Sequence, residues 1–215
     1  MESKEQYIFL SYFLDHDTPS YGGEKGLFKA EAVRSIKSGD HVNTSFLSFP
    51  NHIGTHIDFP FHFIENGKKL EDYPASFWIF NKVGLINSSF EHLKENIDLI
   101  DKQIEFLIVK TGFGSKRKTS SYWKKQPIIK AELAYFLKKN FKNLRVLGFD
   151  MISLTSQLDK TEGKNAHLAF LKENNILIVE DMKLDDLFTC PATIVVSPLQ
   201  VSEIDGTPCT IFSFF

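Results

Sequence analysis

Short apolar runs recur along this sequence, and their length limits the folds open to the chain. Several of them are followed directly by Asp or Pro, which interrupt regular structure. Apolar runs of this kind are typical of buried strands. The sequence therefore predicts strands at residues 7–14, 42–49, 77–86, 105–109, 145–149, 176–179 and 193–196.

Two helical patterns lie between the later strands. In residues 131–140 the apolar side chains recur at i, i+3 and i+4, which places them on one face of a helix. Residues 165–174 repeat this pattern and end at a pair of asparagines. Strands crowd the N-terminal half, whereas strand and helix alternate in the C-terminal half. We therefore expect an α/β fold with one mixed sheet and helices packed on it.

Length and charge narrow the possible functions. The 215 residues amount to about 1.4 times the ~150 residues of a typical domain, so we expect one domain over residues 1–215. The formal net charge of −2 argues against a nucleic-acid binder, and the basic run at residues 116–118 is too short to change that expectation. Residues 110–126 are polar and contain glycine, which predicts a surface loop bordering a site.

No segment has the sequence of a targeting or membrane-spanning element. The apolar run at residues 7–14 lacks a basic start and a cleavage site, and no run reaches ~18 apolar residues. Two cysteines, Cys190 and Cys209, are too few for a disulfide framework. We therefore expect free thiols in a cytoplasmic protein with no membrane partner.

The most informative segment is NHIGTHIDFPFHF, residues 51–63. Pro60 argues against a helix here, so we interpret the segment as extended chain. Alternate residues then face opposite sides: the three histidines and Asp58 share one face, and isoleucine, threonine and phenylalanine share the other. The second face, including Phe59 and Phe63, is expected to pack on the core.

The polar face of this segment predicts a metal site. A straight strand would separate His52 from His62 by about 33 Å, so the chain must bend, and Gly54 and Pro60 permit a bend. His56 and Asp58 lie about 6.6 Å apart along one face, and a turn at Gly54 lets His52 join them. Two imidazoles and a carboxylate suit zinc, with manganese or iron possible, and leave a coordination position for water.

The string His-x-Gly-Thr-His-x-Asp-x-Pro-x-His, residues 52–62, resembles the signature of the cyclase family of metal-dependent hydrolases, which includes bacterial kynurenine formamidase and isatin hydrolase. The resemblance covers most of the chain in order. It includes SYFLDHDTPSYGG, IVKTGF, LGFDMISLTS and NAHLAFLKENNILIVEDM. It implies a swivelling β/β/α-like fold and a homo-oligomer, dimeric or larger.

The resemblance also implies roles for particular residues. The implied metal ligands are His52, His56, Asp58, His167 and Glu180, the last two completing a second metal position. His62 is the implied proton-transferring residue. The implied cofactor is one or two divalent ions, zinc or manganese. From the residues alone, His167 lies in a predicted helix and Glu180 directly follows a predicted strand, while His16, His41 and His92 lack suitable neighbours.

Tyr21 marks a departure on the substrate side, because tryptophan is common at this place in the family's early turn. The sequence after Phe149 also differs from that of formamidases. Tyr21 is expected to form part of an apolar wall that binds an aromatic ring. The expected activity is hydrolysis of an amide, formamide or cyclic amide or ester bond of a small substrate by metal-activated water. Two alternatives stay open: a lactone or lactam cyclase or isatin-type ring opening on the same site, and a non-catalytic metal- or ligand-binding protein.

Overall fold

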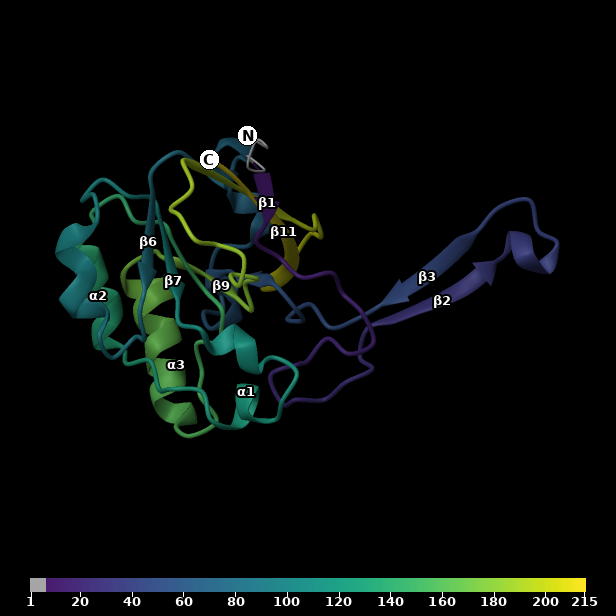
Figure 1. Ribbon diagram of the computed structural model, residues 1–215, viewed down its shortest axis with the longest axis horizontal. Helices are drawn as coiled ribbons and strands as arrows, with labels where there is room; N and C mark the ends of the chain where they lie inside the picture. Colours follow the sequence, from purple (N-terminus) through teal and green to yellow (C-terminus); the bar gives the residue numbers. More distant parts are fainter. Residues whose placement is uncertain (1–6) are drawn as a thin grey trace.

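A mixed sheet of nine strands forms the body of the molecule in the computed structural model, which describes residues 7–215 (Figure 1). Its order is β5-β10-β11-β4-β9-β8-β7-β6, with β1 also paired to β11. The strands are β1 (Tyr7–Phe9), β4 (His56–Asp58), β5 (Ile79–Phe80), β6 (Val83–Asn87), β7 (Phe106–Lys110), β8 (Val146–Phe149), β9 (Leu177–Glu180), β10 (Thr193–Pro198) and β11 (Gly206–Phe214). The predicted mixed α/β fold is confirmed.

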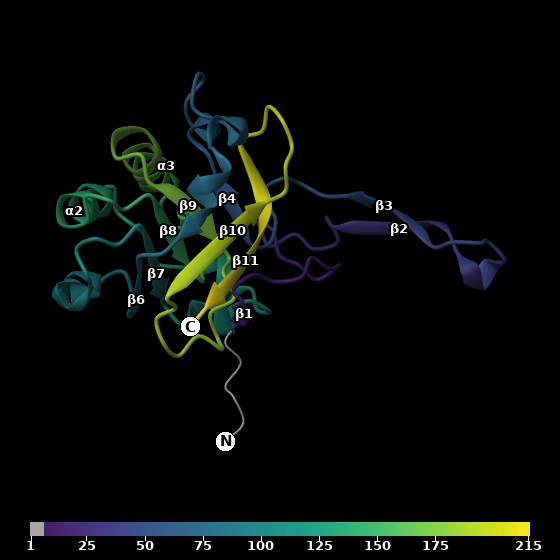
Figure 2. The same cartoon turned by 90° about the horizontal axis from the view of Figure 1, so that it is seen from above.

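The parallel half of the sheet, β6–β9, holds the core. Its neighbours are joined by crossovers, and the centres of its strands carry fully buried residues such as Ile108, Leu147 and Ile178. Each buried side chain of this size contributes roughly 1.5–3 kcal/mol. Helices α2 (Glu132–Asn140) and α3 (Lys160–Leu168) flank these strands (Figure 2).

The helix predictions differ in accuracy. The helix at 131–140 is confirmed as α2, whose Leu133, Ala134 and Leu137 are buried. The helix predicted at 165–174 begins five residues earlier, as α3, and continues as a π-helical turn over Ala169–Glu173. Asp159 explains the earlier start, because its carboxylate accepts a hydrogen bond from the backbone N–H of Glu162 at 2.9 Å and caps the helix.

Four strand predictions are confirmed to within two residues, as β7, β8, β9 and β10. Two others are only partly right. The run at 7–14 is a strand only over β1, and the run at 77–86 is divided between a 3-10 turn (Ala75–Trp78), β5 and β6. Further 3-10 turns are Ile36–Ser38, Pro60–His62, Leu70–Asp72 and Leu93–Leu99.

The strand predicted at 42–49 exists but is not buried. β3 (Thr44–Ser48) pairs with β2 (Lys29–Arg34), and this hairpin projects away from the body (Figures 1 and 2). Its apolar side chains face outward; Val33 is 65% exposed and Phe46 60% exposed. The prediction of a buried strand was therefore wrong here. We call this hairpin, residues 29–48, the arm.

The predicted surface loop at 110–126 is also largely wrong. It contains a 3-10 turn (Phe113–Lys116) and helix α1 (Ser121–Lys124), and Tyr122 is fully buried. Asp150, at the end of β8, orders its start, because the Asp150 carboxylate accepts backbone hydrogen bonds from Thr111 and Gly112 at 2.8 and 2.9 Å.

Two smaller expectations concern the cysteines and membrane segments. Cys190 and Cys209 are both free thiols. Among the residues described, no helix combines the length and the apolar character needed to cross a bilayer.

Candidate metal centre

The predicted bend at Gly54 is confirmed. Gly54 has φ +60°, and a Cβ there would lie 2.5 Å from Cδ2 of Leu14, so glycine suits the position on both counts. The bend brings the His52 ring to 5.1 Å from the His56 ring, measured between centroids.

The extended interpretation fails after Asp58. Pro60–His62 form a 3-10 turn in which proline takes the first position, where it needs no N–H partner. The turn carries His62 back until its ring lies 4.1 Å from that of His52. Phe63 packs against the core, as predicted, and its ring also stacks on that of His167, 4.4 Å away between centroids, so that it lines the pocket as well.

Strand pairing places Glu180 opposite His56. The two residues are register partners in the antiparallel β4–β9 pair, and Nε2 of His56 lies 3.3 Å from Oε2 of Glu180. Nδ1 of His56 lies 2.8 Å from the Gly54 carbonyl oxygen, which fixes the ring when Nδ1 donates. Nε2 then keeps its lone pair toward the cluster.

His167 enters the same cluster from the last turn of α3. Its Nδ1 is 2.8 Å from the Gly163 carbonyl oxygen, while Nε2 lies 3.5 Å from Oδ2 of Asp58 and 3.8 Å from Oε1 of Glu180. The helix therefore orients one ring nitrogen through its own backbone and presents the other to two buried acids.

Asp58 belongs to two groups of potential ligands. In each group the donor atoms all lie within 4.8 Å of one another; the groups are His52, His56 and Asp58, and Asp58, His167 and Glu180. Oδ1 of Asp58 is buried and accepts no hydrogen bond of suitable geometry, although Nδ1 of His52 lies only 2.9 Å away. An unpaired buried carboxylate oxygen among imidazole nitrogens fits a divalent cation.

The buried acids set the charge state of the cluster. Burial raises the pKa of the Asp58 carboxyl, but contacts with the imidazoles of His167 and His52 outweigh this and hold the pKa well below its usual value. Burial likewise disfavours charged imidazoles, yet the carboxylates of Asp205 and Asp58 raise the pKa of His52 to about 10. For His167, burial is outweighed by Asp58 and Glu180, and the pKa rises to about 9. The acids thus favour positive charge at the centre.

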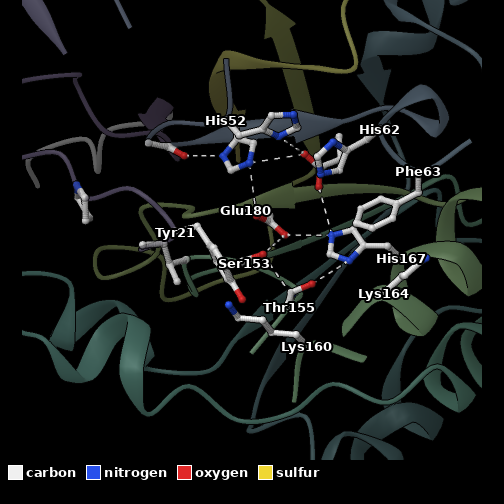
Figure 3. A pocket seen from close by; sticks show the side chains of 15 residues that line it. Tyr21, His52, His62, Phe63, Ser153, Thr155, Lys160, Lys164, His167 and Glu180 are labelled. Carbon is white, nitrogen blue, oxygen red and sulfur yellow. Dashed lines mark hydrogen bonds and ion pairs between the residues drawn. The ribbon is translucent and has the colours of Figure 1, made fainter. Parts of the chain in front are cut away.

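A cavity of about 380 Å³ opens beside the cluster (Figure 3). Besides the histidines, it is lined by Tyr21, Phe63, Lys160 and Lys164. The hydroxyl of Tyr21 is buried and has no hydrogen-bond partner. The cavity therefore combines an aromatic wall with an unused donor next to the ligand cluster.

The structure brings the residues singled out in the sequence to one cavity, together with others that the sequence did not indicate. His52, His56, Asp58, His62, His167 and Glu180 all line this cavity, whereas His16, His41 and His92 are exposed. Asp205 was missed, although the Asp-Gly pair at 205–206 is a turn signal directly before an apolar run. Ser153 was also not predicted as a site residue; its hydroxyl donates to Oε1 of Glu180 at 3.1 Å.

Glu180 is followed by a strained residue that other groups hold in place. Asp181 has φ +51°, is buried, and forms paired hydrogen bonds with Arg117 at 2.7 and 2.8 Å. The Tyr122 hydroxyl also donates to its carboxylate, and the Thr55 hydroxyl donates to its carbonyl at 2.6 Å. Arg117 is therefore part of a buried ion pair and not of a solvated basic run.

Replacing Arg117 by Gln is expected to destabilise the protein by about 3–5 kcal/mol, because it leaves the Asp181 carboxylate buried without its counter-charge. Denaturant unfolding measures this, with the exposed Lys118→Gln as the matched loss of charge. Equal stability of the two variants would contradict the role given to the Arg117–Asp181 pair.

Known proteins match this chain over nearly its whole length. It matches the Cyclase ("Putative cyclase") family over residues 8–156. It is 30% identical to kynurenine formamidase of Bacillus mycoides over 207 residues, and 29% identical to that of Bacillus anthracis over 205 residues, covering 94% of each chain in both cases.

Solved structures share the fold. Isatin hydrolase A from Labrenzia aggregata aligns with a TM-score of 0.80 and 18% identity, covering 96% of this chain and 92% of that one. A potential metal-dependent hydrolase with cyclase activity aligns with a TM-score of 0.72 and 20% identity, covering 97% and 96%. The family match over most of the chain confirms the resemblance seen in residues 52–62: the protein belongs to the Cyclase family.

Proposed function

We propose that this protein is a metal-dependent hydrolase of a non-peptide carbon–nitrogen bond, and that it cleaves the formamide or amide of a small aromatic substrate as a kynurenine formamidase does. The observation that carries the proposal is the buried Asp58, shared by two ligand groups at the wall of an aromatic-lined cavity. The names of the 29–30% identical relatives agree with it. The same lines support a single catalytic domain spanning the chain.

The ligand set is proposed to hold one or two divalent ions. His52, His56 and Asp58 would hold the first ion, and Asp58, His167 and Glu180 the second. The mixture of imidazole nitrogen and carboxylate oxygen favours zinc, with manganese as the alternative. Bound there, a divalent ion would lower the pKa of a coordinated water from ~15.7 toward ~7 and polarise the scissile carbonyl.

His62 is placed to transfer the proton in this reaction. It lines the cavity, and its Nδ1 lies 2.7 Å from Oδ2 of Asp205. When Nδ1 donates to that carboxylate, Nε2 is left as a base that can accept a proton from the attacking water and return it to the leaving nitrogen.

Tyr21 and Phe63 are proposed to bind the substrate. Phe63 presents a ring that is already stacked on His167, which suits an aromatic group. The Tyr21 hydroxyl, buried without a partner, is an available donor for the substrate carbonyl oxygen.

The protein is further proposed to be a cytoplasmic homo-oligomer, a dimer or tetramer. The arm supports the oligomer, because its two strands pair with each other while Ile36, Phe46 and Leu47 remain more than half exposed. The free Cys190 and Cys209 are in keeping with a reducing compartment.

Removal of metal with a chelator is expected to abolish hydrolysis of N-formylkynurenine, and zinc or manganese should restore it. His62→Ala should retain its metal content and lose about 10²–10⁴-fold in kcat. Isatin and an aryl ester tested in parallel distinguish formamide cleavage from ring opening. Turnover that is indifferent to the chelator would end the proposal, and loss of metal from His62→Ala would make His62 a ligand.

Tyr21→Phe is expected to lower kcat/KM about 10-fold, the usual value of one lost hydrogen bond in a buried site. It should not lower the free energy of unfolding, because it removes a hydroxyl that has no partner in the protein. Tyr135→Phe, on the exposed side of α2, is the control. An unchanged kcat/KM would mean that the Tyr21 hydroxyl does not touch the substrate.

Phe46→Glu is expected to dissociate the oligomer, because it places a charge on the apolar surface of the arm. Light scattering across a range of protein concentrations measures the mass. Leu99→Glu removes a similarly exposed apolar residue from the body and should leave the mass unchanged. A wild-type protein that is monomeric throughout would refute the oligomer.

A further inference from the structure

Asp205 lies beside the histidine-bearing segment because of strand register. Gly206 is the partner of Asp58 in the antiparallel β11–β4 pair, and the Asp205 carbonyl accepts a hydrogen bond from the Phe59 N–H at 2.9 Å. Asp205 therefore arrives next to the segment through backbone pairing, from a part of the chain about 150 residues away in sequence.

The Asp205 carboxylate contacts two imidazoles with one oxygen. Oδ2 lies 3.0 Å from Nε2 of His52 and 2.7 Å from Nδ1 of His62. Oδ1 accepts a hydrogen bond from the side-chain amide of Asn51 at 2.6 Å. All three partners belong to residues 51–62, so this one segment holds the Asp205 carboxylate in place.

These contacts select which nitrogen of each ring carries a proton. Nε2 of His52 donates to Asp205, so Nδ1, which faces Oδ1 of Asp58 at 2.9 Å, is the nitrogen that would give up its proton to a cation bound beside Asp58. When Nδ1 of His62 donates to the same carboxylate, Nε2 of His62 is left free. One acid thereby orients a proposed metal ligand and the proposed proton-transferring residue.

Gly206 makes this approach possible. A Cβ at position 206 would lie 2.3 Å from Cε1 of His52 and 2.9 Å from Nδ1 and Nε2 of the same ring. The ring therefore packs directly on the backbone that follows Asp205, and any larger residue would displace it.

We infer that Asp205 is a positioning residue that couples the metal ligand His52 to the proton-transferring His62. The inference rests on the proposed function for His62, whereas its His52 half concerns metal binding alone. A competing reading is that His52, His62 and Asp205, whose donor atoms also lie within 4.8 Å of one another, hold an ion of their own.

The test is Asp205→Asn, which keeps the size and an acceptor oxygen but removes the charge. Glu203→Gln, in the same turn, is the matched control, because Glu203 pairs with Lys69, which is outside the proposed ligand set. Chelator competition should show zinc bound about 10–100-fold more weakly by Asp205→Asn, with unchanged stoichiometry at saturating zinc. With zinc saturating, kcat should fall at least about 10-fold while KM changes little.

A double-mutant cycle separates positioning from general structural damage. In a His62→Ala background, Asp205→Asn should lower kcat far less than it does in the wild type, because the residue that it orients is gone. Asn51→Ala removes the hydrogen bond to Oδ1 of Asp205 and should also weaken zinc binding, by a smaller factor than Asp205→Asn does. It serves in place of Asp205→Asn if that variant does not fold.

Three results would overturn the inference: zinc affinity and kcat equal to wild type in Asp205→Asn, additive losses in the cycle, or a stoichiometry reduced by one ion, which would make Asp205 a ligand. If the wild type turns over none of the substrates, the proposed function fails. The zinc competition then still decides whether Asp205 positions His52.

Discussion

Strand β4 is three residues long, yet its pairing on both edges places the two buried acids of the centre and His56 beside one another. β9 on one edge sets Glu180 opposite His56, and β11 on the other sets Gly206 opposite Asp58. A register shift of one residue in either pair would send these side chains to the opposite face of the sheet. Backbone hydrogen bonds, which carry no chemistry of their own, therefore assemble a cluster whose members come from distant parts of the chain.

This assembly has an electrostatic cost that explains its composition. Asp58 and Glu180 are 1% and 3% exposed, and two carboxylates buried side by side repel each other and lose hydration. The imidazoles of His56 in β4, His167 in α3 and His52 in the loop before β4 surround them, and Ser153 donates to Glu180. Even so, Oδ1 of Asp58 accepts no hydrogen bond of suitable geometry. A divalent cation bound there would use this oxygen as a ligand.

Features that depend only on neighbouring residues in the chain could be predicted from the sequence. The alternation in residues 51–63, the bend at Gly54 and the periodicity of α2 were all visible in the printed chain. Even there the extended chain ended early, because Pro60 begins a 3-10 turn, after which Phe63 packs against the core and also lines the cavity.

Features that depend on long-range contacts were not predictable. The arm has the apolar composition of a buried strand, and nothing local reveals that it leaves the body. Arg117 stands in a basic, glycine-containing stretch, and only the fold brings Asp181 to it. Asp205 needed the β4–β11 register. His167 and Glu180 came from the family resemblance, since a helical histidine and an acid at a strand end are ordinary on their own.

The most direct test of this account is anomalous diffraction from crystals of the protein grown with zinc or with manganese. The account predicts one or two anomalous peaks within coordination distance of Asp58, with His52 and His56 around the first and His167 and Glu180 around the second. A fully loaded crystal with its peaks elsewhere, or with Asp58 outside the coordination sphere, would contradict it.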